Sequence, residues 1–345
     1  MENITLLESM LQAAQKICVV THTHPDGDAL GSAVAMQLYL SQRLGKDAAA
    51  LVPDTIPQNL KFLSRGRRVT DAKADPGKAE KLIREAGLII VIDLNELHRT
   101  EQLQPLLEAS PAPKIIIDHH LHPDLKPFSL VFSEPERSSA CELLYYILKE
   151  LEGGRVRRIP AAARTALMAG MTTDTTNFGN STGPDTLRMA GELIEAGVDR
   201  EGLLDRLYHR ERPERIYAHA DMVARHLTVL PGGIAVMVMD TALQRAYRLR
   251  EGETENLVNV PLNIGTIKMS IFARQEDDIF RISIRSKRSW SARTMAAEYF
   301  HGGGHELAAG GKIFTGSDVP DAAAVPAYLE SVAARFLRSK TAQTK

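Results

Sequence analysis

Short apolar runs that end on aspartate or histidine recur along this sequence, and they constrain its fold more than any other feature. The runs lead to His22, Asp93, Asp118 and Asp174, and they occupy residues 16–20, 88–92, 114–117 and 166–171. Each has the length of one buried strand, and helical patterns separate most of them. Continuous apolar strands that alternate with helices predict a parallel sheet covered on both faces.

The length of 345 residues and the change of pattern along the chain predict two domains. Residues 1–200 are expected to form an α/β domain with a doubly wound parallel sheet. The charged segment 201–228 is interpreted as a helical linker, with one connecting helix over 201–226. Residues 229–345 are expected to form a smaller α/β domain with a mixed sheet, because the candidate strands there alternate apolar with polar residues, as they do at 234–239, 266–273 and 278–286.

Composition excludes several classes of protein. The net charge is −1, and a protein that grips long nucleic acid usually has a basic excess, so any nucleic-acid substrate is expected to be short. The two cysteines, Cys18 and Cys141, form no CxxC pattern and are interpreted as buried small apolar residues. No apolar stretch is long enough to span a membrane, and the N-terminus lacks the features of a signal peptide, which predicts a cytoplasmic protein.

The ends of the apolar runs predict a metal site. In an open parallel sheet, ligands bind beyond the carboxyl ends of the strands, so these acidic and imidazole side chains should share one crevice. Four carboxylates, those of Asp26, Asp28, Asp93 and Asp174, would repel one another there. Two divalent cations would balance them, and ligands of this kind without cysteine favour Mn²⁺, with Mg²⁺ or Co²⁺ as alternatives. His24 and His122 are interpreted as solvated.

The motifs around these residues resemble those of the DHH phosphoesterase family. Its first four motifs are matched in chain order by His22-x-x-x-Asp26-x-Asp28, Asp93 with Arg99, Asp118-His119-His120, and Thr173-Asp174-Thr175 with Phe178. The segment Ser138-Ser139-Ala140-Cys141-Glu142 also fits a family pattern. In the second half, the pattern that resembles the DHHA1 substrate domain consists of Arg285-Ser286, Gly302-Gly303-Gly304-His305 and Ala308-Ala309-Gly310.

The resemblance implies a role for each matching residue. One metal would be held by His22, Asp26 and Asp93. The other would be held by Asp28, Asp93, His119 and Asp174, so that Asp93 bridges the two. His120 would face the substrate phosphate, and Asp118 would orient a histidine from behind. Two such metals can lower the pKa of a shared water and take up charge on the phosphoryl oxygens.

The small bacterial members of this family act on very short oligoribonucleotides and on 3′-phosphoadenosine 5′-phosphate (pAp), and some are labelled exopolyphosphatase-related. The resemblance therefore implies an oligoribonuclease of the 3′–5′ type that also converts pAp to AMP, and a homodimer is expected by the same analogy. In the second domain, Arg285, Ser286, Gly302, Gly303, Gly304 and His305 would bind substrate, since glycine amides can approach a phosphate closely. A plain turn is the alternative for the glycines, and packing is the alternative to base stacking for Trp290 and Phe178.

Other functions remain open from the residues alone. A phosphodiesterase for cyclic dinucleotides or their pApA product would carry the same motifs. A pyrophosphatase or exopolyphosphatase-type hydrolase would share the first domain, and a processive RecJ-like exonuclease would usually carry further nucleic-acid-binding parts. A nucleotide-binding regulatory module without catalysis is the alternative from a different class, but such a module has no need of a bridged metal pair.

Overall fold

The computed structural model describes residues 3–287 and 290–343, with side chains up to residue 340. The chain divides into two compact units, Met1–Arg210 and Glu211–Lys345. Each unit has its own sheet and its own hydrophobic core.

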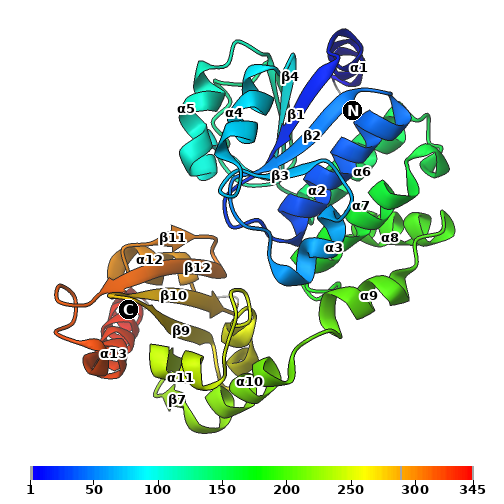
Figure 1. The fold of residues 1–345 in the computed structure, drawn as a ribbon. Coiled ribbons are helices and arrows are strands. Elements are labelled where there is room, and N and C mark those ends of the chain that lie inside the picture. Colours follow the sequence, from blue (N-terminus) through cyan, green and yellow to red (C-terminus); the bar gives the residue numbers. More distant parts are fainter. Residues whose placement is uncertain (1–2, 288–289, 344–345) are drawn as a thin grey trace. The chain divides into compact units, whose positions relative to one another are not determined.

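The first unit is built on a six-stranded sheet in which every pair of neighbouring strands is parallel (Figure 1). The order is β3-β2-β1-β4-β5-β6, which is the doubly wound arrangement with a reversal of direction between β1 and β4. The predicted fold class is confirmed. The strands are β1 Lys16–Val20, β2 Asp47–Val52, β3 Val69–Asp71, β4 Leu88–Ile92, β5 Lys114–Asp118 and β6 Leu130–Ser133.

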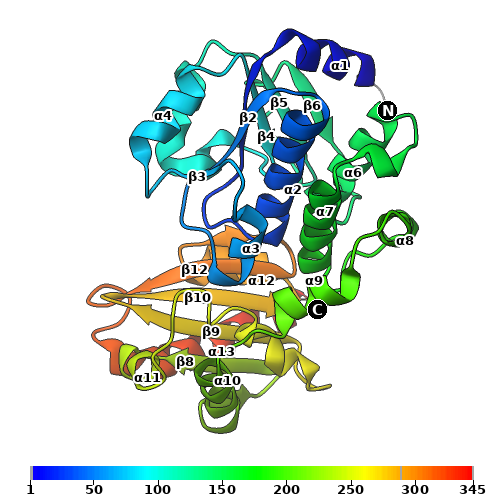
Figure 2. The same cartoon turned by 45° about the vertical axis from the view of Figure 1, so that its right-hand side comes forward.

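Helices cover both faces of this sheet, as the unbroken apolar strands require. Alternate residues of one strand enter different cores: Ile17 and Val19 of β1 face one side, while Cys18 and Val20 face the other. Helices α2, α6 and α7 cover the first side and α4 and α5 the second (Figures 1 and 2). The helices are α1 Ile4–Ala13, α2 Gly27–Leu38, α3 Lys61–Ser64, α4 Pro76–Arg84, α5 Gln104–Ala109, α6 Ala140–Leu151, α7 Ala161–Asp174, α8 Pro184–Glu195 and α9 Arg200–Tyr208.

Two sequence-based expectations about helices are corrected. The run at 166–171 is not a strand but the middle of α7, which ends at Asp174. Its residues are mainly Ala, Leu and Met, which favour helix over the β-branched residues typical of strands. The charged segment 201–226 does not form one helix. It forms α9 and, after a break at 209–212, α10 Pro213–Arg225, because Pro213 cannot continue a preceding helix.

The second unit contains a mixed six-stranded sheet, also as expected. Its order is β11-β12-β10-β9-β8-β7, antiparallel except between β8 and β9. Helices α12 and α13 cover one face through Met295, Leu329 and Phe336. The elements are β7 Leu227–Leu230, β8 Ile234–Met239, α11 Thr241–Ala246, β9 Met269–Glu276, β10 Ile279–Ser286, α12 Ala292–Tyr299, β11 Gly303–Gly304, β12 Ala308–Phe314 and α13 Val325–Gln343.

The prediction of buried cysteines is confirmed in the described part of the chain. Cys18 and Cys141 are both buried and unpaired. Within residues 3–287 and 290–343, no helix has the length and apolar character needed to cross a membrane.

Candidate metal centre

The predicted ligands gather at the carboxyl edge of the first sheet, around the point where strand order reverses. His22 follows β1, Asp93 follows β4 directly, and His119 follows β5. Asp93 has a left-handed backbone with φ 62°, which is uncommon for a residue other than glycine. Such conformations concentrate at functional sites, where the surrounding structure holds them in place.

Helix α2 supplies two carboxylates with different surroundings. Asp26 caps the helix, and its side chain accepts the backbone N–H groups of Asp28 and Ala29 at 3.0 Å each. Asp28 lies two residues further on, in the first turn of the helix, and is buried. Its carboxylate accepts the N–H of Ala140 at 2.6 Å and the N–H of Cys141 at 2.9 Å, so the N-terminus of α6 holds it in place.

Asp174 reaches the same site from the end of α7, and small residues make this approach possible. Helices α2 and α7 pack closely along their length (Figure 2). A Cβ atom on Gly170 would lie 2.3 Å from Cys141 Sγ and 2.9 Å from Asp28 Oδ1. A Cβ atom on Gly31 would lie 2.7 Å from the carbonyl oxygen of Ala166. Glycine at these positions therefore lets α7 bring Asp174 beside Asp28.

Asp93 lies between two groups of possible ligands. Its Oδ2 is 3.5 Å from His22 Nε2, and its Oδ1 is 3.6 Å from His119 Nε2. His119 Nε2 is also 3.7 Å from Asp174 Oδ2 and 3.9 Å from Asp28 Oδ2. Among the residues that the structure describes, ligand atoms within 4.8 Å of one another form three groups that could each hold an ion: His22, Asp26 and Asp93; Asp28, His119 and Asp174; and Asp93, His119 and His120.

The imidazoles of His22 and His119 are oriented by backbone carbonyls. Nδ1 of His22 lies 2.7 Å from the carbonyl oxygen of Thr23, and Nδ1 of His119 lies 3.2 Å from that of Arg137. A carbonyl only accepts hydrogen bonds, so each Nδ1 carries the proton, and the lone pair of each Nε2 points toward the carboxylates. This is the common arrangement of histidines that bind metals.

His120 is held in a different way. Its Nδ1 lies 2.7 Å from Oδ1 of the fully buried Asp118, whose Oδ2 also accepts the backbone N–H of His120 at 3.1 Å. Its Nε2 lies 3.2 Å from the guanidinium of Arg99. Sequence reasoning identified Arg99 only as part of a motif. The signal that it belongs to this site is its position in the segment that follows β4.

The electrostatics of the site favour bound cations. Burial, and next the nearby carboxylate of Asp26, raises the pKa of Asp28 to about 7. Burial, and next the charge of Asp28, raises the pKa of Asp174 to about 8 and that of Asp93 well above its usual range. Oδ1 of Asp93 is buried and has no hydrogen-bond partner among the described residues. A divalent cation would neutralise these carboxylates and satisfy that oxygen, so the donor set fits metal ions.

The histidines respond to the same surroundings in opposite ways. Burial lowers the pKa of His22 and of His120, which keeps both rings neutral near pH 7. Burial acts in the same direction on His119, but the carboxylates of Asp93, Asp174 and Asp118 outweigh it and raise the pKa of that ring. His119 is therefore the imidazole that faces the strongest negative potential in the site.

In the second unit, Gly303 and Gly304 form strand β11 of a hairpin with β12, and residues 305–307 connect the two strands. Gly303 and Gly304 pair with Gly310 and Ala309 of β12. A Cβ atom on Gly302 would lie 2.0 Å from the carbonyl oxygen of Gly310, and Gly304 has φ 139°. Close approach of the two strands, rather than a plain turn, thus accounts for Gly302 and Gly304, and the contact of the glycines with a phosphate stays a prediction.

Of the other predicted substrate residues, Arg285 and His305 lie near this hairpin and Ser286 is buried. Arg285 is half-buried on β10, opposite Ala308 of β12, whose carbonyl accepts the N–H of His305 at 2.7 Å. Arg285 and His305 therefore come to the same end of this strand pair. The hydroxyl of Ser286 is buried and donates to the carbonyl of Trp290 at 2.5 Å.

The two aromatic residues considered for base stacking have different surroundings. Trp290 is buried against Phe336 in the second core, so the packing alternative holds for it. The ring of Phe178 is only partly buried, and the guanidinium of Arg200 lies 5.4 Å from its centroid. His24 lies 3.4 Å from Asp54, and His24 and His122 are exposed or largely so, in line with their interpretation as solvated residues.

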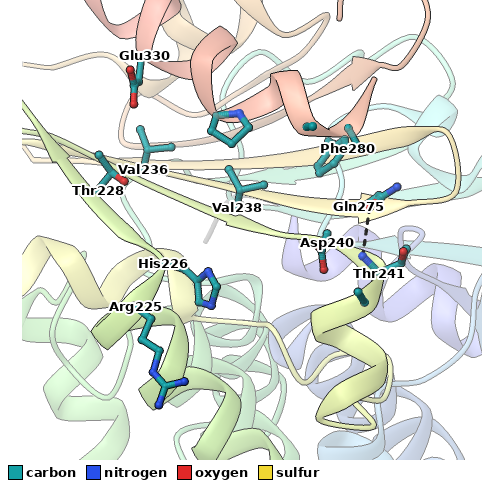
Figure 3. Close-up of a pocket in the computed structure, with 14 residues that line it drawn as sticks. Arg225, His226, Thr228, Val236, Val238, Asp240, Thr241, Gln275, Phe280 and Glu330 are labelled. Atoms are coloured by element: carbon teal, nitrogen blue, oxygen red, sulfur yellow. Dashed lines mark hydrogen bonds between the residues drawn. The ribbon is translucent and has the colours of Figure 1, made fainter. Parts of the chain in front are cut away.

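A pocket of about 590 Å³ also lies in the second unit (Figure 3). Val236, Val238 and Phe280 line its apolar part, while His226 and Asp240 belong to its polar part. Its lining includes none of the residues predicted to bind substrate.

The fold and the carboxylate–imidazole site together define the class of protein. Residues 16–171 match the domain family described as "DHH family, N-terminal domain". Residues 234–331 match the family described as "DHHA1 domain". The chain therefore contains a DHH-family N-terminal domain over residues 16–171, followed by a DHHA1 domain over residues 234–331. The resemblance inferred from the motifs is confirmed.

Individual relatives agree with this assignment. The bifunctional oligoribonuclease and PAP phosphatase NrnA of Thermus thermophilus is 29% identical over 315 residues, which cover 90% of this chain and 88% of that protein. The cyclic-di-AMP phosphodiesterase GdpP of Geobacillus thermodenitrificans is 27% identical over 87% of this chain, but only 45% of that protein is covered. The crystal structure of an exopolyphosphatase-related protein from Bacteroides fragilis has a TM-score of 0.89 and 28% identity, with 98% and 97% of the two chains covered.

Proposed function

We propose that this protein is a metal-dependent phosphoesterase that hydrolyses short oligoribonucleotides to mononucleotides and converts pAp to AMP. The observation that carries the proposal is the position of Asp93, whose two oxygens face His22 on one side and His119 on the other. A carboxylate placed between two ligand groups is what a pair of metals requires. The relative from Thermus thermophilus, which matches over most of both chains, supports the choice of substrates.

In this proposal, His22, Asp26 and Asp93 would hold one cation, and Asp28, Asp93, His119 and Asp174 would hold a second. When bound, such cations activate water and neutralise charge on the phosphoryl oxygens. The hard oxygen and imidazole donors favour Mn²⁺ over metals that prefer thiolates. A cytoplasmic location and a homodimer are proposed only by analogy with the family.

The residues of the chain itself would bind and orient the phosphate. His120 is neutral near pH 7, and its Nδ1 donates to Asp118, which fixes the plane of the ring. Arg99 beside it adds a positive charge that a phosphoryl oxygen would share. In the second unit, Arg285, Ser286 and the segment 302–305 would bind a further part of the substrate, with Arg285 suited to a two-pronged contact with phosphate.

A second candidate function is hydrolysis of cyclic dinucleotides or pApA. The similarity to the cyclic-di-AMP phosphodiesterase GdpP favours it, since the match extends over both units of this chain. The chain spans less than half of that relative, whereas it covers most of the Thermus thermophilus protein. The oligoribonuclease assignment therefore has the stronger support.

One panel of substrates separates these functions. Purified protein with Mn²⁺ is incubated with pAp, labelled di- to pentaribonucleotides, a long RNA, cyclic di-AMP, pApA and pyrophosphate. We expect the fastest hydrolysis on the short ribonucleotides and pAp. Equal rates on short and long RNA would contradict the substrate assignment, and turnover confined to cyclic di-AMP or pApA would favour the second candidate.

A further inference from the structure

Glu142 is a buried acidic residue in the first turn of α6 that touches none of the proposed metal ligands directly. Its side chain accepts four hydrogen bonds. Oε2 accepts the backbone N–H of Ser138 at 3.1 Å, the hydroxyl of Ser138 at 2.5 Å and the hydroxyl of Thr186 at 2.8 Å, while Oε1 accepts the guanidinium of Arg137 at 3.2 Å. With 2% of its surface exposed, Glu142 has a fixed position.

The first consequence concerns the peptide that joins Arg137 to Ser138. The N–H of this peptide donates to Glu142, and the carbonyl of the same peptide accepts from Nδ1 of His119 at 3.2 Å. In a trans peptide these two groups point in opposite directions, so they are oriented together. Glu142 therefore sets the direction of the carbonyl that orients the His119 ring.

The second consequence concerns Asp28. Ser139 caps α6 by accepting the N–H of Glu142 at 3.0 Å, and the next two amides, of Ala140 and Cys141, donate to the carboxylate of Asp28. The bonds of Glu142 to Ser138 and Thr186 hold this helix start in place against α8. A single turn, residues 137–141, thus positions both Asp28 and His119, and Glu142 supports that turn from the inside.

We infer that Glu142 is a positioning residue for the metal centre, which acts through the 137–138 peptide on His119 and through the start of α6 on Asp28. This inference rests on the proposed metal site. Groups that orient metal ligands from behind typically change metal affinity about 10- to 100-fold when they are mutated.

The decisive variant is Glu142→Gln, which keeps the shape of the side chain. Ser138 N–H and Arg137 donate to different oxygens of Glu142, and an amide replaces one of these oxygens by an NH2 donor, so the Gln side chain cannot accept both bonds in this arrangement. We expect Mn²⁺ affinity to fall about tenfold, measured by titration with detection of free Mn²⁺ by electron paramagnetic resonance, while circular dichroism shows a folded protein. Glu142→Ala, which removes every acceptor, should lose more affinity than Glu142→Gln.

Glu192→Gln is the matched control. Glu192 also joins α8 to α6. Its carboxylate accepts a hydrogen bond from the hydroxyl of Tyr145, and another from Lys149 Nζ at 2.7 Å, but it supports no part of the 137–141 turn. We expect Glu192→Gln to keep the Mn²⁺ affinity of the unmodified protein. Unchanged affinity in Glu142→Gln, or an equal loss in both Gln variants, would overturn the inference. If the unmodified protein itself bound no Mn²⁺, the proposed function would fail instead.

Discussion

At the scale of single residues, the most informative side chain is Asp93. It is buried, adopts a left-handed backbone conformation, and leaves Oδ1 without a hydrogen-bond partner among the described residues. Each of these features costs stability in the absence of an ion. Burial penalises the charged form of the carboxyl group, an unpartnered buried oxygen has lost its hydrogen bonds to water, and a left-handed backbone is strained in a residue other than glycine. This loss of stability is offset if Asp93 serves a function, and in the proposed function it serves to bind metal.

The substitution Asp93→Asn is expected to have opposite effects on stability and on activity. The amide keeps the shape but removes a charge that Asp28 and Asp26 repel. We expect the metal-free variant to melt at the same temperature as the unmodified protein or higher, while hydrolysis of pAp falls at least about 100-fold. Thermal unfolding in a chelator and a phosphate-release assay would measure the two effects.

Asp47→Asn is the control for that experiment. Asp47 begins β2, at the opposite edge of the same sheet, and forms an ion pair with Arg68 on the surface. Its variant should keep full activity. An active Asp93→Asn protein would contradict the metal assignment.

The raised pKa values of the ligands predict how pH and metal act together. The pKa values of Asp28 and Asp174 rise from 3.8 to about 7 and about 8 in the folded protein without metal. Between about pH 4 and pH 8 the folded state therefore binds more protons than the unfolded state, and its free energy of unfolding falls as the pH rises. Metal ions displace these protons, so they bind more tightly at higher pH.

The expected result is that the increase in melting temperature caused by saturating Mn²⁺ is larger at about pH 8 than at about pH 6. Scanning calorimetry with and without Mn²⁺ at both pH values measures it. An increase that is independent of pH would show that the ligands do not exchange protons for metal. Asp174→Asn should reduce the pH dependence, because it removes one of the groups that titrate.

At the scale of elements, the strands were easier to predict than the helix that completes the site. The runs at 16–20, 88–92 and 114–117 are apolar throughout because the sheet is buried on both faces, and this pattern is visible in the sequence. The run at 166–171 is equally apolar because α7 is buried between other elements. A short buried helix segment and a buried strand have the same hydropathy pattern, so only the residue types distinguish them.

The close packing of α7 on α2 leads to a prediction for Gly170→Ala. The added methyl group would overlap Cys141 Sγ and Asp28 Oδ1, at 2.3 and 2.9 Å. Helix α7 must move away from α6, which carries Cys141, and from α2, which carries Asp28. This costs about 1–3 kcal/mol of stability and moves Asp28 away from Asp174. We therefore expect a lower melting temperature together with weaker Mn²⁺ binding.

Gly191→Ala in α8 provides the comparison. A Cβ atom at this exposed position would meet no described atom within 4 Å. Alanine is the better helix former by up to about 1 kcal/mol, so this variant should be slightly more stable and bind Mn²⁺ normally. A Gly170→Ala protein that behaved in the same way would show that the packing of α2 on α7 does not control the site.

At the scale of the whole molecule, the parts of the site that could be predicted are those that follow strands. His22, Asp93 and His119 are brought together by topology alone, since parallel strands end at one edge of the sheet. The support from Arg137, Glu142 and Arg99 could not be predicted in this way. It depends on which backbone carbonyl or carboxylate lies behind each imidazole, and such contacts are set by the packing of loops rather than by any periodic pattern.

The two units of the chain have separate cores, and this separation predicts separate effects on metal and on substrate. Arg285 belongs to the second unit, and every proposed metal ligand belongs to the first. Lysine at position 285 would keep the charge but lose the planar, two-pronged contact that arginine makes with phosphate. We expect Arg285→Lys to raise KM for pAp and short oligoribonucleotides about tenfold, with a smaller change in kcat and the same Mn²⁺ affinity.

Steady-state kinetics on pAp and on a trinucleotide, combined with the Mn²⁺ titration, test this division of roles. Arg338→Lys is the control. Arg338 is an exposed residue of α13, which covers one face of the second sheet, whereas the side chain of Arg285 lies on the other face. Its KM should not change. A loss of Mn²⁺ affinity in Arg285→Lys would mean that the second unit takes part in metal binding. An unchanged KM would mean that the phosphate of the substrate is recognised by other residues, and the segment 302–305 would then be the next to substitute.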